Sequence, residues 1–348
     1  MKIKQTIKDV AKKSGYSVST ISLVVNKKPN VAKKAREEIQ KVIDELGFHP
    51  QRSARGLASS ASGNIGFIAT NEHFTHAEPF YTKVFLGTEF EARKYHYYVL
   101  LTTVGYTMKE TDEIPRFLLE HNIDGVIIAG KIGSSWLDYI RKRNIPLLLV
   151  DYELPRSPYS SVVMDNRTGA RLVVQHLRKG GHTKIGFIGG DMEHPSIGER
   201  YHAFREELES AGLPIKESWT CIDGPDTRLV DGHEAAKKIF FDRSDRPTAV
   251  FAANDIMAIG CMRYLKDAGL KVPNDVAVVG FDNIEAALHV EPRLTTVNVH
   301  REELGSLAVR RIVEMIKDKS TVVTKTLVPV ELIVRESCGI ESEPTVSD

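Results

Sequence analysis

The chain has 348 residues, 42% of them hydrophobic and 27% charged, the proportions of a soluble globular protein with roughly two or three domains. It contains no run of about 18 apolar residues and no charged start before an apolar stretch, so we expect no transmembrane helix, no secretory signal and a cytoplasmic location. The net charge of +1 hides an asymmetry, because residues 1–56 hold 13 Lys and Arg against 5 Asp and Glu, and the remainder holds 34 against 41. A basic head on an acidic body suits DNA binding, since Lys and Arg neutralise phosphates and release counterions.

Residues 6–26 (TIKDVAKKSGYSVSTISLVVN) predict two short helices. Apolar residues at helical spacing form two stripes, Ile7, Val10 and Ala11 in the first and Ile21, Val24 and Val25 in the second. Between them, Gly15 permits a left-handed corner and Ser17 is placed to cap the second helix. This pattern predicts a helix-turn-helix, whose second helix would present Val18, Ser19 and Leu23 to a DNA groove.

Residues 33–46 (KKAREEIQKVIDEL) predict a third, amphipathic helix that ends at Gly47. Its inward positions are Ile39, Val42, Ile43 and Leu46. An ordinary helical hairpin is the alternative for the first two helices alone. The third helix and the basic charge favour a small all-α DNA-binding headpiece, to which we assign residues 1–48.

Residues 49–63 are predicted to form a hinge helix and a linker. Pro50 ends regular structure, residues 51–58 are long enough for about two helical turns, and residues 59–63 are small. So short a helix is not stable alone in water, and its order must therefore come from DNA or from a second subunit. Leu57 beside arginines is typical of a minor-groove wedge, although packing on the body is the alternative.

From residue 65 onward, short apolar strands alternate with amphipathic helices. Strands are predicted at 65–70, 97–103, 124–130, 145–151, 184–190, 248–255 and 275–282. Their Val, Ile and Leu runs are typical of parallel strands buried on both faces. Because NIGFIAT begins at Asn64 and KIGFIGG at Lys184, and other strand pairs have similar offsets, we infer an internal duplication that gives two doubly wound α/β lobes.

Two such lobes place the carboxyl ends of both sets of strands around one cleft, where open α/β sheets bind ligands. Asp151, Asn254, Asp255 and Asp282 follow or end predicted strands, and Arg200 begins a predicted helix. Helix capping is the alternative for the Asp and Asn residues, and Asp255 fits it well. Polar groups that converge from both lobes favour a small-ligand site.

Taken together, the motifs resemble those of the lactose repressor family of bacterial transcriptional regulators, over nearly all of the chain. They include TIKDVAKKSGYSVSTISLVVN, NVAKKAREEIQKVIDELGFHPQRSARGLAS, GHTKIGFIGG, ERYHAF, AANDIMAIG, VGFDNIEAA and PRLTTV. The resemblance implies a homodimer whose headpieces read a pseudo-palindromic operator in the major groove, with hinge helices in the minor groove. It also implies a periplasmic-binding-protein-like sensor that controls DNA binding allosterically.

The resemblance implies DNA contacts at Thr6, Ser17, Val18, Ser19, Thr20, Ser22, Leu23, Asn26, Asn30, Val31, Arg55, Leu57 and Ala58. Many members have an Arg where this chain has Leu23. Because Leu cannot make the bidentate contact of Arg with guanine, we expect a base preference shifted toward a thymine methyl.

The resemblance places effector contacts at Tyr81, Asp151, Ser196, Arg200, Arg228, Asn254, Phe281 and Asp282. Arg donors and Asp acceptors suit a polyhydroxylated ligand such as a sugar, with the ring of Tyr81 or Phe281 against its apolar face. The chain departs from many sugar-binding members at residues 226–228, where they place an aromatic. Because Arg200 and Arg228 both face the expected cleft, a sugar acid or sugar phosphate is the next candidate after a neutral sugar.

The resemblance further implies that the chain crosses between lobes three times, near Asp165, Arg293 and Leu327. The first lobe would then comprise about 64–164 and 294–326, and the second about 165–293 and 327–348. No leucine heptad follows Ser337, so we expect a dimer and not a four-chain assembly.

We therefore expect a repressor controlled by a small effector, with no cofactor; the alternative is a regulator of the same family controlled by a corepressor or a phosphoprotein partner. An enzyme is disfavoured because GxGxxG, GxxxxGKS and HExxH are missing. A metal site at His73 and His76 is disfavoured because only Glu72 and Glu78 accompany them. A periplasmic sugar-binding protein would share the body but not the basic headpiece. The isolated Cys221, Cys261 and Cys338 predict reduced structural thiols.

Overall fold

The structure, a computed structural model, describes residues 5–25, 28–48, 61–71, 80–109, 111–154, 156, 158–224, 226–242, 244–318 and 322–340. It divides into two compact units, Met1–Gly63 and Asn64–Asp348. Several sequence predictions lie outside the described residues: the hinge helix at 51–58 with Arg55, Leu57 and Ala58, the DNA contact at Asn26, and the pair His73 and His76.

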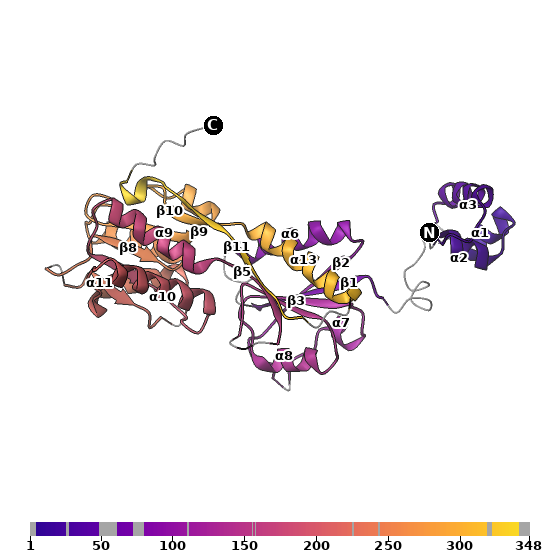
Figure 1. The fold of residues 1–348 in the computed structure, drawn as a ribbon, viewed down its shortest axis with the longest axis horizontal. Helices are drawn as coiled ribbons and strands as arrows, with labels where there is room; N and C mark the ends of the chain where they lie inside the picture. The colour runs from indigo at the N-terminus through magenta and orange to yellow at the C-terminus, as the bar shows by residue number, and fades with distance from the viewer. Residues whose placement is uncertain are drawn as a thin grey trace. The chain divides into compact units, whose positions relative to one another are not determined.

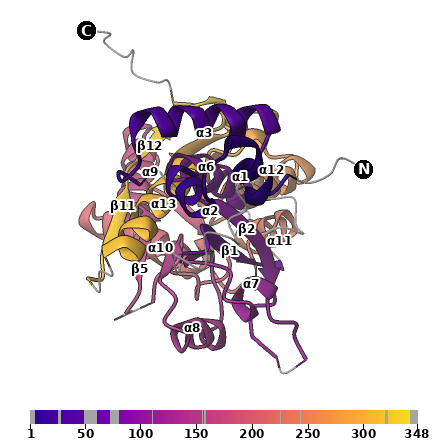
Figure 2. The same ribbon diagram turned by 90° about the vertical axis from the view of Figure 1, so that its right-hand side faces the viewer.

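The first unit contains the predicted headpiece of three helices, α1 (Ile7–Ser14), α2 (Val18–Val25) and α3 (Lys33–Leu46), drawn in Figure 2. Their apolar faces enclose a small core of Val10, Ile21, Val24, Ile39, Ile43 and Phe48. Gly15 ends α1 in the left-handed region with φ of 75°. The Ser17 hydroxyl accepts a hydrogen bond from the Thr20 N–H at 3.1 Å, so it caps α2. The helix-turn-helix is confirmed.

The first lobe of the second unit is a six-stranded sheet in which all neighbours are parallel, in the order β11-β5-β4-β3-β1-β2. Its strands are β1 (Asn64–Thr70), β2 (Tyr98–Val104), β3 (Gly125–Ala129), β4 (Leu147–Val150), β5 (Ser160–Met164) and β11 (Lys325–Val328). Helices α6 (Phe80–Lys94) and α13 (Arg301–Asp318) cover one face, and α7 (Arg116–Leu119) and α8 (Ser134–Arg141) lie on the other (Figure 1).

The second lobe repeats this topology, with strand order β12-β10-β9-β8-β6-β7. Its strands are β6 (Ile185–Ile188), β7 (Thr220–Cys221), β8 (Ala249–Ala252), β9 (Ala277–Asp282), β10 (Thr295–Val299) and β12 (Val330–Ile333). Only β12 runs antiparallel to its neighbour among the described strands. Helices α9 (Asn166–Lys179) and α10 (Pro195–Ser210) pack on one face, and α11 (Leu229–Ile239) and α12 (Asp255–Asp267) pack on the other.

The chain passes between the two sheets after β5, after β10 and between β11 and β12. The second crossing differs from the sequence prediction near Arg293, because β10 pairs with β9 and therefore belongs to the second lobe. Its Thr295, Thr296 and Val297 are buried there, so the return to the first lobe begins after Val299. The matching order of the two sheets agrees with the duplication inferred from the strand offsets.

Three short 3₁₀ helices, Glu217–Trp219, Glu285–Leu288 and Glu336–Cys338, complete the described elements of the second lobe. Cys221, Cys261 and Cys338 are buried and unpaired with one another. Within the described ranges, no helix combines the length and the apolar character that crossing a membrane requires.

Candidate functional site

The outer face of α2 carries the residues that the sequence assigned to DNA reading. Val18 and Leu23 are 43% and 37% exposed although they are apolar, and Ser17 and Ser19 are exposed beside them. Thr20, Ser22 and Val31 are half-buried, and Asn30 and Thr6 are exposed. The opposite face of α2 holds Ile21 and Val24 in the headpiece core. The helix therefore presents small polar and apolar side chains outward, as contact with base edges requires.

The described headpiece also carries exposed basic side chains. The exposed ones in the described headpiece include Lys8, Lys12, Lys28, Lys33 and Lys34. Lys13 differs from them because it forms an ion pair with Glu45 at 2.9 Å, which joins α1 to α3. The exposed lysines supply the positive field that attracts a phosphate backbone.

The cleft between the lobes encloses a cavity of about 700 Å³. Seven of the eight side chains predicted to hold an effector border it, namely Tyr81, Asp151, Ser196, Arg200, Arg228, Asn254 and Asp282. They come from both lobes, because Tyr81 and Asp151 belong to the first sheet and its helices whereas the others belong to the second. A volume of this size fits a small molecule.

The structure contradicts the predicted effector contact at Phe281. Its ring is fully buried in the core and does not border the cavity. Phe281 belongs to the core on the α9 side of the sheet, whereas the next residue, Asp282, ends β9 and borders the cavity. The guanidinium carbon of Arg200 lies 3.7 Å from the centroid of the Phe281 ring. Phe281 therefore supports Arg200 from behind the cleft.

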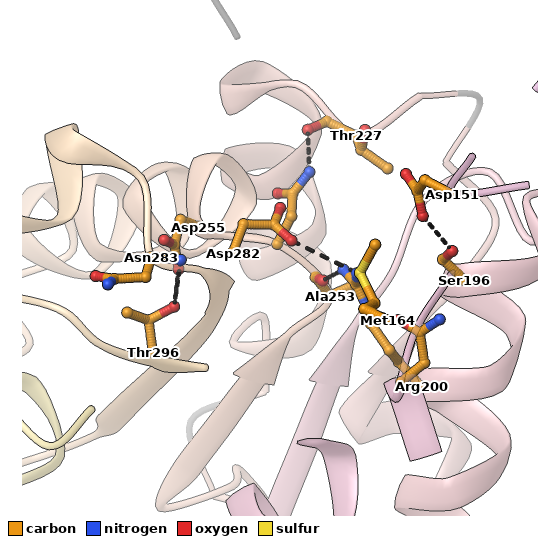
Figure 3. Close-up of polar contacts among 12 residues, drawn as sticks. Asp151, Met164, Ser196, Arg200, Thr227, Ala253, Asp255, Asp282, Asn283 and Thr296 are labelled. Carbon is orange, nitrogen blue, oxygen red and sulfur yellow. Dashed lines mark hydrogen bonds and ion pairs between the residues drawn. The ribbon is translucent and has the colours of Figure 1, made fainter. Parts of the chain in front are cut away.

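Arg200 is 3% exposed, and its guanidinium is surrounded by acceptors. Nε donates to Asn166 Oδ1 at 2.8 Å, and NH1 donates to the Ala253 carbonyl at 2.6 Å. NH2 lies 3.1 Å from the Met164 sulfur and 3.5 Å from Asp282 Oδ1 (Figure 3). These contacts hold the cation in one orientation at the cleft.

Asp151 joins the two lobes. Its Oδ2 accepts from the Tyr81 hydroxyl at 2.8 Å. Its Oδ1 accepts from the Ser196 hydroxyl of α10 at 2.6 Å (Figure 3). Asp151 has φ of 53° and Asp282 has φ of 108°, conformations that are costly for residues other than glycine. Such strain is concentrated at functional sites, and here it occurs where strands β4 and β9 end at the cavity.

Asn254 and Asp255 have structural partners. The Asn254 side chain accepts from the Met257 N–H at 2.8 Å, so it caps α12, and its Nδ2 donates to the Thr227 carbonyl at 3.1 Å. Asp255, which the sequence suggested as a cap, is instead the first residue of α12. Its carboxylate accepts from the Ile284 N–H at 2.8 Å.

Burial raises the pKa of two carboxyl groups near the cavity. It raises the pKa of Asp282 to about 6, although Arg200 acts in the opposite direction. Burial, and next the charge of Asp282, raise the pKa of Asp255 well above its usual range. A carboxyl with a raised pKa beside a buried arginine is a frequent feature of ligand-binding sites.

The cavity residues that the sequence analysis did not identify include Lys131, Asp191 and His194. Lys131 donates to Asp191 at 2.6 Å and to Glu193 at 3.0 Å, which forms a second connection between the lobes. Burial alone would lower the pKa of Lys131, but these two hydrogen bonds raise it. Lys131 and Asp191 directly follow the predicted strands 124–130 and 184–190. Ligands of open α/β sheets bind at the carboxyl ends of the strands, and this rule was sufficient to find both residues.

Arg228 borders the cavity but is already neutralised. Its Nε lies 3.1 Å from Asp226 Oδ2 and 3.0 Å from Asp231 Oδ2. The second arginine of the cleft is therefore engaged on its own loop and at the start of α11. Among the described residues, no group of three or more His, Cys, Asp and Glu side chains is arranged to hold a metal ion.

Comparison with known families gives two matches along the chain. Residues 6–51 match the family "Bacterial regulatory proteins, lacI family", and residues 174–338 match "Periplasmic binding protein-like domain". The HTH-type transcriptional repressor PurR of Photobacterium profundum is 33% identical over 336 residues, which cover 95% of this chain and 98% of the relative. The PurR repressor of Vibrio parahaemolyticus is 34% identical over 319 residues, covering 90% and 92%.

Solved structures agree with these relatives. A complex of the transcriptional regulator CelR with cellobiose has a TM-score of 0.73 at 29% identity and covers 96% of this chain and 99% of that one. The Lac repressor dimer bound to operator and the anti-inducer ONPF has a TM-score of 0.79 at 26% identity, covering 97% and 99%. Three findings lead to the same assignment: sequence similarity over almost the full length of the chain, the helix-turn-helix headpiece and the two-lobed body. The chain belongs to the lacI family of bacterial regulatory proteins, and it is a DNA-binding transcriptional repressor of that family.

Proposed function

We propose that this repressor is controlled by a neutral, hydroxyl-rich small molecule, a sugar or sugar derivative, bound in the cleft between the lobes. The observation that carries the proposal is the pairing of the charges around the cavity. Three basic side chains and four aspartates border it. Lys131 pairs with Asp191, Arg200 with Asp282 and Arg228 with Asp226, at 2.6, 3.5 and 3.1 Å.

This pairing bears on the charge of the ligand. An anion would have to displace a carboxylate from each cation it approached, and it would meet Asp151 as a further negative charge. A neutral polyol needs no displacement, because its hydroxyls can donate to the aspartate oxygens and accept from the arginine. The apolar lining of Phe80, Tyr106, Ile197, Leu229, Val230 and Ile256 suits the C–H face of a sugar ring. A neutral ligand is therefore favoured over a sugar acid or sugar phosphate.

The CelR complex supports this choice, because its ligand is cellobiose. The Lac repressor structure, a dimer bound to operator, supports a similar assembly for this chain. We infer that two copies pair and place their α2 helices against a pseudo-palindromic operator. The exposed Val18, Ser19 and Leu23 would then read base edges.

Ligand binding would change the balance between two lobe arrangements. The ligand would contact both lobes, whose present arrangement is held by Asp151–Ser196 and Lys131–Asp191. A ligand that prefers one arrangement shifts the equilibrium, and a coupling of roughly 1–3 kcal/mol changes DNA affinity by about 5- to 150-fold.

Thermal unfolding of the full chain tests the proposal, with a panel of mono- and disaccharides, sugar acids, sugar phosphates and purines. A compound at about 100 times its Kd stabilises the protein by about 2.7 kcal/mol and raises Tm by several degrees. We expect a neutral sugar to give this shift, and Asp282→Ala to abolish it. Asp267→Ala, at the exposed end of the neighbouring helix α12, is the matched control and should retain the shift.

Gel-shift titration with the stabilising compound then shows whether it releases or promotes operator binding. Stabilisation by sugar acids or phosphates alone would contradict a neutral ligand. If no compound in the panel raises Tm, control by a sugar in the cleft is contradicted and a protein partner is favoured. The DNA-binding assignment would stand.

A further inference from the structure

One extended segment forms an edge of both sheets. β11 (Lys325–Val328) is the last strand at one side of the first sheet, and β12 (Val330–Ile333) is the last strand at one side of the second. Only Pro329 separates them, and Figure 1 shows them as one long yellow segment that runs along both lobes. Among the described strands, none pairs with the outer side of this segment. An edge of this kind is a template for pairing with another chain.

The backbone of the segment directs hydrogen-bonding groups to its outer side. The carbonyls of Thr324 and Val328 accept hydrogen bonds from the first sheet, on the inner side. Because successive residues of a strand direct their backbone groups alternately to its two sides, Lys325 and Leu327 direct theirs outward. The alternation of side-chain exposure continues without a break into β12, with exposed residues at Lys325, Leu327, Pro329 and Glu331. The outward groups therefore continue along the whole segment.

Apolar side chains are exposed along this edge. Val323 and Leu327 are 49% and 53% exposed. Sheet edges that face only solvent are commonly protected by charges and proline, and Lys325 and Pro329 supply such protection at two positions only. The exposed apolar residues beside them favour a covered edge over a solvated one.

The sequence of the segment, residues 322–334 (VVTKTLVPVELIV), is complementary to itself in an antiparallel pair. When Val328 lies opposite the same residue of a second copy, the facing positions are Lys325 with Glu331, Val323 with Ile333, and Leu327 with Pro329. Opposite charges and β-branched residues at facing positions stabilise an antiparallel ladder. A shift by one residue would place outward backbone groups opposite inward ones, so the register is specific.

The charged pair of this register is available although both residues have partners in their own chain. Lys325 lies 2.8 Å from Glu153 and keeps 40% of its side chain exposed. Glu331 accepts from Asn298 Nδ2 at 2.9 Å and is also exposed. Each can therefore meet the opposite charge of a second copy without losing its present contact.

We propose that the edge formed by residues 322–334 pairs antiparallel with the same edge of a second copy of this chain, in the register centred on Val328. The pairing is two-fold symmetric, so the same residues contribute from both copies. Pro329 has no N–H, and each Leu327–Pro329 pair thus forms one hydrogen bond in place of two. The contact is independent of the ligand in the cleft, and in a protein that binds its operator as a dimer it joins two such dimers.

Charge substitutions at Leu327 test the pairing in the full chain. Leu327 lies next to the two-fold axis, so its side chain is diagonal to that of the second copy. Leu327→Asp and Leu327→Lys should each weaken self-association by about tenfold, because apolar contact is lost and like charges meet. An equimolar mixture of the two variants should regain it, because opposite charges then meet.

Sedimentation velocity across a wide concentration range measures the assembly. We expect the unsubstituted protein and the mixture to reach about twice the mass of either variant alone. Phe241→Asp is the matched control, since Phe241 is 87% exposed just beyond α11, and it should assemble like the unsubstituted protein. Equal masses for the unsubstituted protein and Leu327→Asp would overturn the inference, and so would a mixture that keeps the lower mass.

Cysteine cross-linking tests the register. The chain's own three cysteines are buried, so introduced thiols at the edge react selectively. A mixture of Leu327→Cys and Pro329→Cys proteins, oxidised with diamide, should form disulfide-linked pairs faster than either protein alone, because facing Cβ atoms lie close together. A mixture of Val323→Cys and Pro329→Cys is the control and should react slowly. Faster linkage in the control mixture would overturn the register, and no linkage in either would overturn the contact.

Discussion

Arg200 lies over the ring of Phe281, with its guanidinium carbon 3.7 Å from the ring centroid. The contact joins α10 to β9 beneath the cleft, and it leaves the edge of the guanidinium free to reach Asp282. A cation over an aromatic face is attracted by the ring quadrupole, most strongly where water is excluded. The orientation of Arg200 therefore depends on a residue that does not border the cavity.

Replacing Phe281 by Leu should weaken effector binding about tenfold as well as destabilise the fold. The substitution removes the ring beneath Arg200 and leaves a partly filled cavity, at a cost of roughly 1–3 kcal/mol. Urea unfolding measures the stability, and calorimetry with a sugar identified in the panel measures the affinity. Phe240→Leu, a buried Phe on the other face of the same sheet, should cost similar stability and leave the affinity unchanged. Equal losses of affinity in both variants would contradict the prediction.

Replacing Gly169 by Ala should displace the Phe281 ring. A Cβ at Gly169 of α9 would lie 2.6 Å and 2.7 Å from two carbons of that ring, closer than packed atoms approach. We expect a loss of roughly 1–3 kcal/mol and weaker effector binding. Gly198→Ala on α10, where the nearest atom would lie at 3.5 Å, should instead raise stability by up to about 1 kcal/mol through helix propensity. Thermal unfolding distinguishes the two, and a Gly169→Ala protein as stable as Gly198→Ala would refute the steric argument.

Replacing Asp282 by Asn should stabilise the protein increasingly as pH rises. Because burial raises the pKa of Asp282 to about 6, the folded state binds this proton more tightly than the unfolded state does, whose carboxyl has a pKa of about 3.9. Ionisation between about pH 4 and 6 therefore costs stability, and Asn cannot ionise. We compare the free energy of unfolding of the Asp282→Asn protein with that of the unsubstituted protein. The difference, variant minus unsubstituted, should grow by on the order of 1–3 kcal/mol between about pH 4.5 and 7.5. Urea unfolding across this range tests it, and a constant difference would show that the pKa is not raised.

Replacing Leu23 by Arg should change which operators are bound. Leu23 is 37% exposed on the outer face of α2, where it offers only apolar contact, such as with a thymine methyl. Arg can bond guanine twice, for about 1–3 kcal/mol of discrimination. Selection from randomised DNA should yield guanine at one symmetric pair of positions for Leu23→Arg. Leu23→Ala should weaken specific binding without changing Tm of the effector-binding body, and identical selected sites for all three proteins would exclude a base contact here.

Much of the molecule follows from the amino-acid sequence, because local spacing determines local structure. Apolar residues recur at helical spacing in each of three segments, around Val10, around Ile21 and Val24, and around Ile39. This spacing is sufficient to predict three helices with one apolar side each. Gly15 is sufficient for the turn between the first two, since few other residues tolerate its backbone angles. Buried parallel strands are similarly recognisable, and residues at their carboxyl ends, such as Asp151 and Asp282, converge wherever two such sheets meet.

The tertiary structure decided what spacing does not encode. Whether Phe281 faces the cleft or the core depends on which side of β9 packs against α9, and whether Arg228 is available depends on Asp226 and Asp231 folding onto it. The strand β10 lies in the second lobe because of its pairing with β9, a long-range choice. Local pattern thus determines elements and strand ends, whereas burial and hydrogen bonding, which depend on neighbours brought together by folding, determine which polar groups remain free to meet a ligand.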